Sequence, residues 1–134
     1  MSEQELSSDG WCFACGDANP AGLHLHFEQT EEGYETLFET RPEHTGYAGI
    51  VHGGLIATVL DEVAARYTWV LGDPAVTARM ELRYRQPVKV GEKLKIRCRL
   101  TGSKGRLTFA QTTAHNEQGE LVAEAKVTLS RLEA

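Results

Sequence analysis

The chain has 134 residues, 41% of them hydrophobic and 25% charged, which fits one globular domain and excludes an intrinsically disordered chain. No apolar run approaches the roughly 20 residues that cross a bilayer, and the start lacks a signal-peptide pattern, so we expect a cytoplasmic protein that contacts no membrane. The net charge of −5 is unevenly distributed: residues 1–40 hold nine acids and no Lys or Arg, whereas residues 79–106 hold ten of the fourteen basic residues. The acidic total therefore does not exclude an anionic partner for the basic segment.

The first half of the chain predicts a loop, a hairpin and a helix. Residues 1–10 are polar and expected to be flexible, whereas residues 11–23 are rich in turn formers and predict an ordered loop. Strands over residues 24–30 and 34–40 flank a turn and predict a hairpin. Residues 53–71 predict the single helix, which ends at a Gly-Asp-Pro sequence. The apolar residues at helical spacing are Leu55, Ile56, Val59, Leu60, Val63, Ala64 and Tyr67.

The second half of the chain predicts strands over residues 77–85, 93–100, 107–115 and 121–130. Strands with an apolar residue at every second position need one face covered, and only one helix is available to cover it. We therefore predict an α+β fold: a long antiparallel sheet wrapped around one central helix. We expect it to form a single domain over residues 1–134.

The three cysteines, Cys12, Cys15 and Cys98, are an odd number and do not suggest a disulfide framework. Cys12 and Cys15, together with His24 and His26, have the residue types of a zinc site, although not the spacing of a standard finger. The alternative, which we favour from the sequence, is that two reduced thiols pack within the loop.

The helix start carries the strongest chemical signal. Gly53 and Gly54 are poor helix formers, but without side chains they let a ligand reach backbone N–H groups that lack an intrahelical partner. Such donors lie at the positive end of the helix dipole, which suits a developing oxyanion. Asp61 follows inside an apolar helix, where a carboxylate is costly unless it is paired or used. Glu62 points about 100° away, so only one of the two can face a site.

The sequence His52-Gly53-Gly54, with six residues before Asp61, resembles the signature of hot-dog-fold acyl-CoA thioesterases of the phenylacetate-degradation (PaaI-like) type. The resemblance covers about residues 40–130, and the Cys-x-x-Cys-Gly loop resembles that of a subset of these proteins. It implies hydrolysis of an acyl-CoA or aryl-CoA thioester to a carboxylic acid and CoA. It implies no cofactor other than the coenzyme A of the substrate.

The resemblance also implies residue roles. Asp61 acts as general base or nucleophile, and Thr77 holds the attacking water. The Gly53 and Gly54 amides polarise the thioester carbonyl, while His52 orders the turn. Many relatives carry Asn where this chain has Gly46, so we expect either a different substrate geometry or a substitute contact from His44.

The spacing of the site residues indicates assembly. Eight residues separate Gly53 from Asp61, about 12 Å along a helix. Reacting atoms must approach to about 3–3.5 Å, so one subunit's amides must act with another subunit's aspartate. We therefore expect a homodimer, or a tetramer built from two dimers.

Basic side chains on the strand 77–85, and in the turn that follows the strand 93–100, are candidates for binding the phosphates of CoA. The alternative is a solvated sheet face. Nucleic acid is disfavoured, because no aromatic side chain lies among these charges on the same strand face. The candidates are Arg79, Arg83, Arg85, Lys104 and Arg106.

Two other functions remain open. A non-catalytic acyl-CoA-binding module of the same fold would keep the groove and the basic surface without needing Asp61. An enoyl-CoA hydratase-type enzyme of this fold would pair an Asp with a His in a different arrangement, which the Gly-Gly sequence fits less well.

Overall fold

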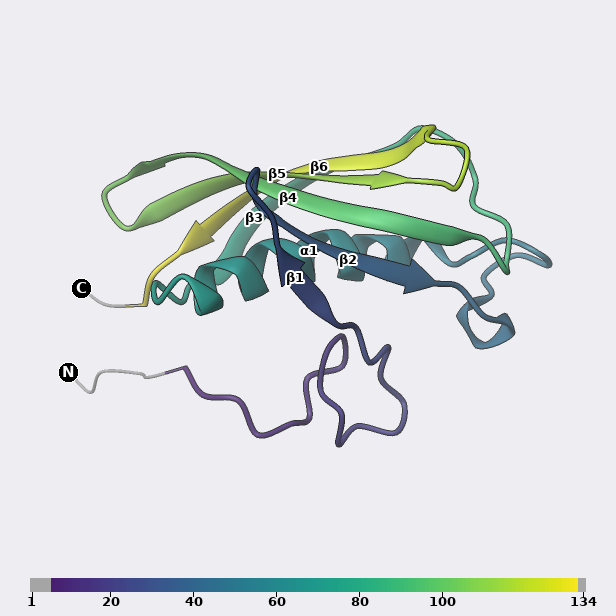
Figure 1. Ribbon diagram of the computed structural model, residues 1–134, viewed down its shortest axis with the longest axis horizontal. Helices are drawn as coiled ribbons and strands as arrows, with labels where there is room; N and C mark the ends of the chain where they lie inside the picture. Colours follow the sequence, from purple (N-terminus) through teal and green to yellow (C-terminus); the bar gives the residue numbers. More distant parts are fainter. Residues whose placement is uncertain (1–5, 133–134) are drawn as a thin grey trace.

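The computed structural model describes residues 6–132 and consists of one antiparallel sheet that packs on one long helix (Figure 1). The expectation of a flexible segment over residues 1–10 therefore falls partly outside the described residues. The sheet order is β1-β2-β4-β5-β6-β3. The elements are β1 (Phe27–Gln29), β2 (Tyr34–Glu39), a 3-10 turn (Pro42–His44), α1 (Gly53–Val70), β3 (Val76–Tyr84), β4 (Lys93–Lys104), β5 (Leu107–His115) and β6 (Leu121–Ser130).

The core lies between α1 and the concave face of the sheet. Val59, Leu60 and Val63 are fully buried on the helix, and β4 presents Leu94 and Ile96 to them at every second residue. This alternation places the basic side chains of β4 on the opposite, solvated face. The α+β fold expected from the sequence is confirmed. Within residues 6–132, no helix has the length and apolar character needed to cross a membrane.

Two strands differ in length from the prediction. β1 is shorter because the segment before it pairs with the N-terminal loop: Leu25 N–H donates to Ala14 O at 2.9 Å, and His24 has a positive φ of 53°. β4 is longer because a register shift between Leu100 and Gly102 carries the strand on to Lys104. A bulge of this kind absorbs an extra residue without ending the pairing.

β3 forms one edge of the sheet and pairs only with β6 among the described residues. Most of its side chains are exposed, including Val76 at 37% and Tyr84 at 52%. A long edge strand with exposed apolar side chains is a surface that folded proteins usually cover or pair. The start of this strand contacts the middle of α1, where Asp61 is found.

Candidate active site

The start of α1 is organised by His52, which caps the helix. Its Nδ1 accepts a hydrogen bond from the Gly54 N–H at 2.9 Å. The Gly54 amide is therefore engaged within the chain, while the Gly53 N–H has no acceptor within residues 6–132. The expected pair of amide donors is reduced to one free donor, Gly53, at the positive end of the helix.

The turn before the helix explains why glycine stands at position 46. Gly46 N–H donates to Ile50 O at 2.8 Å, which folds the turn back against the helix start. A Cβ atom on Gly46 would lie 3.0 Å from His52 Cα, closer than packed atoms tolerate without movement. The asparagine expected from the resemblance therefore does not fit here unless the turn shifts.

His44 does not take the place of that asparagine. Its side chain is buried, with an exposed fraction of 5%, and its Nδ1 accepts a hydrogen bond from Arg41 N–H at 2.9 Å. Burial, reinforced by the nearby Arg41 charge, lowers the pKa of His44 below its ordinary value. The expected substrate contact is thus replaced by a neutral, buried histidine that holds the 3-10 turn.

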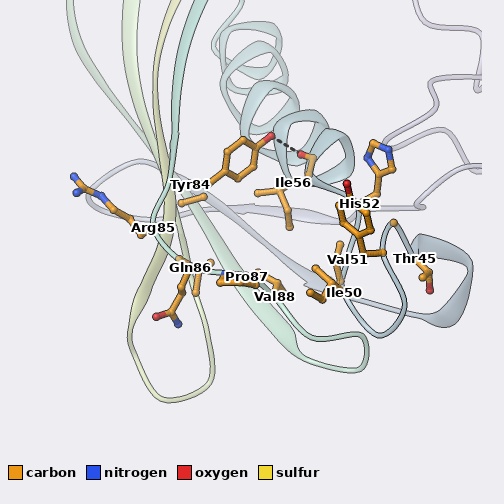
Figure 2. A pocket seen from close by; sticks show the side chains of 15 residues that line it. Thr45, Ile50, Val51, His52, Ile56, Tyr84, Arg85, Gln86, Pro87 and Val88 are labelled. Atoms are coloured by element: carbon orange, nitrogen blue, oxygen red, sulfur yellow. Dashed lines mark hydrogen bonds between the residues drawn. The ribbon is translucent and has the colours of Figure 1, made fainter.

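A cavity of about 790 Å³ opens beside the helix start (Figure 2). Its walls come from the turn before α1, the first turns of the helix and the segment that follows β3. Apolar side chains dominate the labelled part of the wall, with Arg85 and Gln86 at one end. Its volume lies within the range of about 300–1,000 Å³ that small-molecule sites occupy.

Tyr84 links this cavity to the first peptide group of α1, between Gly53 and Gly54. Its hydroxyl donates to the Gly53 carbonyl at 2.7 Å, which Figure 2 marks with a dashed line. Burial raises the pKa of Tyr84, so the hydroxyl stays protonated and remains a donor. In the sequence, Tyr84 follows Met80 and Leu82 at every second position of β3, and no sequence signal distinguishes it from them.

Asp61 and Thr77 lie together, away from the cavity. The Thr77 hydroxyl donates to Asp61 Oδ1 at 2.5 Å, joining the middle of α1 to the start of β3. Asp61 is half-buried and Thr77 is exposed. The pairing of these two residues agrees with their expected proximity. Neither residue lines the cavity beside Gly53, as the helical distance between Gly53 and Asp61 requires.

The basic candidates are scattered over the sheet. Arg79 donates to Glu81 at 3.0 Å, and Arg83 is exposed on the same strand. Arg85 Nε donates to Glu124 at 2.7 Å and lines the cavity. The turn that carries Lys104 and Arg106 lies at the opposite end of the sheet from the helix start (Figure 1). Within one chain, this set does not form a single phosphate site.

The family model of the thioesterase superfamily matches residues 48–123, which include the helix start, Asp61 and Thr77. The chain belongs to the thioesterase superfamily. It is 33% identical to acyl-coenzyme A thioesterase 13 from Mus musculus over 89 residues, which are 64% of this chain and 64% of that protein. The chain thus spans less than two thirds of this relative's length.

Solved structures of other proteins share the fold. A Streptococcus mutans protein bound to acetyl CoA aligns with a TM-score of 0.74 and 25% identity, covering 80% of this chain and 87% of that one. A mutant of the phenylacetic acid degradation protein PaaI from Thermus thermophilus aligns with a TM-score of 0.74 and 25% identity, covering 82% and 95%. These similarities confirm the hot-dog fold and the PaaI-like resemblance inferred from the sequence.

A second cluster of reactive side chains lies on another side of α1. Glu62 Oε2 is 3.6 Å from Cys12 Sγ, and Cys15 completes a group whose three ligand atoms lie within 4.8 Å of one another. Burial raises the pKa of both Cys15 and Glu62. The two other candidate ligands, His24 and His26, lie outside this group. The His24 ring contacts Asn19 O at 2.6 Å instead.

Proposed function

We propose that this chain hydrolyses an acyl-CoA or aryl-CoA thioester to a carboxylic acid and coenzyme A. Membership of the thioesterase superfamily supports the reaction class. The observation that carries the proposal is the hydrogen bond from Thr77 to Asp61, because it holds an accessible carboxylate in a fixed orientation. A carboxylate held in this way can accept a proton from water.

In the proposed reaction, Thr77 occupies Oδ1 of Asp61 and leaves Oδ2 for the attacking water. As the water oxygen bonds to the thioester carbon, its proton passes to Asp61. The carbonyl oxygen becomes an oxyanion, which the Gly53 N–H stabilises. The carbon–sulfur bond then breaks, and the proton held by Asp61 passes to the CoA thiolate as it leaves, which returns Asp61 to its ionised form. His52 supports this arrangement by capping Gly54, so it acts as a positioning residue.

The proposal requires two chains. Gly53 and Asp61 are separated by about 12 Å of helix, and Asp61 and Thr77 lie away from the cavity beside Gly53. The edge of β3, which carries Thr77, pairs with no strand within residues 6–132 and offers a surface on which a second copy can pair. A homodimer that brings Asp61 of one chain to the Gly53 amide of its partner completes the site.

The cavity and the basic residues fit the two parts of such a substrate. The largely apolar wall beside Gly53 suits the acyl or aryl group. Arg85, at the end of the cavity, is the best-placed of the basic candidates for a CoA phosphate in this chain, although it would first have to leave Glu124. Arg79, Arg83, Lys104 and Arg106 contribute only if a partner chain brings them to the same cavity.

The test is Asp61→Asn in the purified protein, assayed by thiol release from short, medium, long and aryl CoA esters. We expect kcat/KM to fall by about 100-fold or more, the usual effect of losing a general base. The matched control is Asp73→Asn, because Asp73 lies beyond the helix and pairs with Arg131. Turnover of Asp61→Asn within a few-fold of wild type contradicts the proposal. Wild-type protein that binds these esters without hydrolysing any of them indicates the acyl-CoA-binding module instead.

A further inference from the structure

The N-terminal loop meets α1 through a group of three potential metal ligands. Cys12 and Cys15 come from the loop, Glu62 comes from the helix, and all three are half-buried. Glu62 directly follows Asp61 in the sequence, but its side chain contacts the loop, whereas Asp61 contacts Thr77. This cluster is therefore separate from the proposed hydrolytic site.

The distance between Cys12 and Glu62 matches that of two ligands in a tetrahedral zinc site. With Zn–S of about 2.3 Å and Zn–O of about 2.1 Å, a tetrahedral angle places the sulfur and the oxygen about 3.6 Å apart. Cys12 Sγ and Glu62 Oε2 lie 3.6 Å apart. All three ligand atoms lie within 4.8 Å of one another, so movements of about 1 Å bring them to the Zn–S and Zn–O distances of coordination.

The loop conformation holds both thiols on the same side. Cys15 N–H donates to Cys12 Sγ at 3.4 Å, and Gly16 N–H donates to Cys12 O at 2.8 Å. A Cβ atom on Gly16 would lie 2.4 Å from Gly10 O, so the tight turn requires glycine directly after the second cysteine. Backbone N–H groups that point at sulfur orient thiolate ligands and stabilise their charge.

The loop is fixed to the rest of the fold before any ion binds. Ala14 is buried between the two cysteines, with an exposed fraction of 3%. The backbone on each side is paired, since Leu23 N–H donates to Phe13 O at 2.8 Å and Leu25 N–H donates to Ala14 O at 2.9 Å. The thiols are thus held near Glu62 by contacts independent of a metal, which lowers the ordering cost of coordination.

We propose that Cys12, Cys15 and Glu62 bind one zinc ion, which pins the N-terminal loop to α1, with water in the fourth position. Two thiolates with one carboxylate favour zinc over magnesium or calcium, which prefer oxygen ligands throughout. As the hydrated ion binds, two S–H bonds break, two Zn–S bonds and one Zn–O bond to Glu62 form, zinc-bound waters are released, and the two protons pass to solvent. The site stabilises the loop and takes no part in the hydrolysis.

The experiment uses cobalt(II) as a spectroscopic probe on the full chain, after reduction and removal of metals with a chelator. We expect one equivalent of cobalt to produce a thiolate-to-cobalt charge-transfer band with the visible bands of tetrahedral cobalt, and zinc to abolish both. Cys15→Ser should lose the charge-transfer intensity contributed by its thiolate, and Glu62→Gln should bind cobalt about tenfold or more weakly. The control is Cys98→Ala, because Cys98 is buried in β4 and should leave the spectrum unchanged.

A second measurement needs no variant. Zinc should protect Cys12 and Cys15 of the wild-type chain from alkylation, as located by peptide mass spectrometry, and should raise its melting temperature. Equal alkylation of both cysteines with and without zinc overturns the proposal. So does the absence of a charge-transfer band in the reduced protein at excess cobalt, or a spectrum that Cys15→Ser leaves unchanged.

Discussion

At the scale of single residues, the helix start has two polar contacts and one free donor, each at a different backbone group. His52 engages the Gly54 amide, Tyr84 engages the Gly53 carbonyl, and the Gly53 amide remains free among the described residues. The two side chains fix the peptide between Gly53 and Gly54, which directly follows the peptide that carries the free Gly53 N–H. A donor that is already oriented costs no reorganisation when the oxyanion forms.

We expect Tyr84→Phe to lower the free energy of unfolding by about 1 kcal/mol, the usual net value of one hydrogen bond. The ring remains, so its packing against Gly53 should persist. Urea unfolding followed by circular dichroism measures the change. The control is Tyr47→Phe, because the Tyr47 side chain is 87% exposed and its hydroxyl should contribute nothing. Equal stability of Tyr84→Phe and wild type would show that the bond to Gly53 adds no net stability.

His44 predicts a dependence of stability on pH. Burial lowers the pKa of its imidazole below the ordinary value of 6.5, so the unfolded chain binds a proton there more readily than the folded one. The folded state is therefore stabilised relative to the unfolded state while His44 is neutral. This contribution is fully present above pH about 6.5 and is lost as the pH falls toward the lowered pKa. We expect His44→Asn, whose Oδ1 can accept the Arg41 N–H without titrating, to lose less stability than wild type between about pH 7.5 and 5.5. Parallel losses in urea unfolding would contradict this.

At the scale of elements, the turn that precedes α1 is as constrained as the helix itself. Gly46 packs against His52, and Val51 N–H donates to Val88 O at 2.8 Å. The cap, the turn and the segment after β3 therefore form one structural unit, which also lines the cavity. A substitution in the turn should therefore alter the structure of the helix start directly.

Gly46→Ala should destabilise the fold by about 1–3 kcal/mol, the usual cost of inserting a methyl group into a packed site. Chemical denaturation measures it. The matched control is Gly102→Ala in β4, where a Cβ atom meets only Phe109, at 3.9 Å. This control should be neutral or slightly stabilising, because alanine has less freedom than glycine in the unfolded chain. A neutral Gly46→Ala would mean that the turn relaxes away from His52.

The sequence predicted α1, β5 and β6 closely, because their apolar periodicity is regular and reflects contact with a single core. β1 was predicted too long, since the pairing of Leu25 with Ala14 depends on a loop that precedes the strand and has no periodic pattern. The proximity of Asp61 and Thr77 followed from a family resemblance. The roles of Tyr84 and Glu62 depend on neighbours from other elements, Gly53 and Cys12, which no local pattern reveals.

At the scale of the whole molecule, the proposed site is divided between chains. The free edge of β3 and the exposed Thr77 lie on the same side of the subunit as Asp61. Pairing of two copies through this edge would cover exposed apolar side chains and complete the site at once. A substitution that prevents two copies from pairing through β3 should therefore abolish activity as well.

Mixing two inactive variants tests this division. Gly53→Pro removes the free N–H, and proline is tolerated at the first helical position; His52, with φ −59° and ψ 127°, already has a backbone suited to precede proline. When it is refolded with Asp61→Asn, the mixed dimers should contain one intact site, which restores about one quarter of wild-type activity for random pairing.

The matched control mixes Asp61→Asn with Thr77→Val. Both residues belong to the same half-site, so no mixed dimer regains an intact one and activity should stay at background. Rescue in this control, or no rescue with Gly53→Pro despite confirmed subunit exchange, would contradict a site shared between chains.

The contacts of Asp61 and Glu62 on different sides of α1 limit how this segment can change in length. One residue inserted between Gly54 and Asp61 would rotate everything beyond it by about 100° relative to the helix start. The Asp61 carboxylate would then leave Thr77, and the loop would lose its contact with Glu62. A whole extra turn would restore the direction but displace both groups by about 5.4 Å. Natural variation in length should therefore be confined to the exposed turns between strands, and this stretch of helix should keep one fixed number of residues.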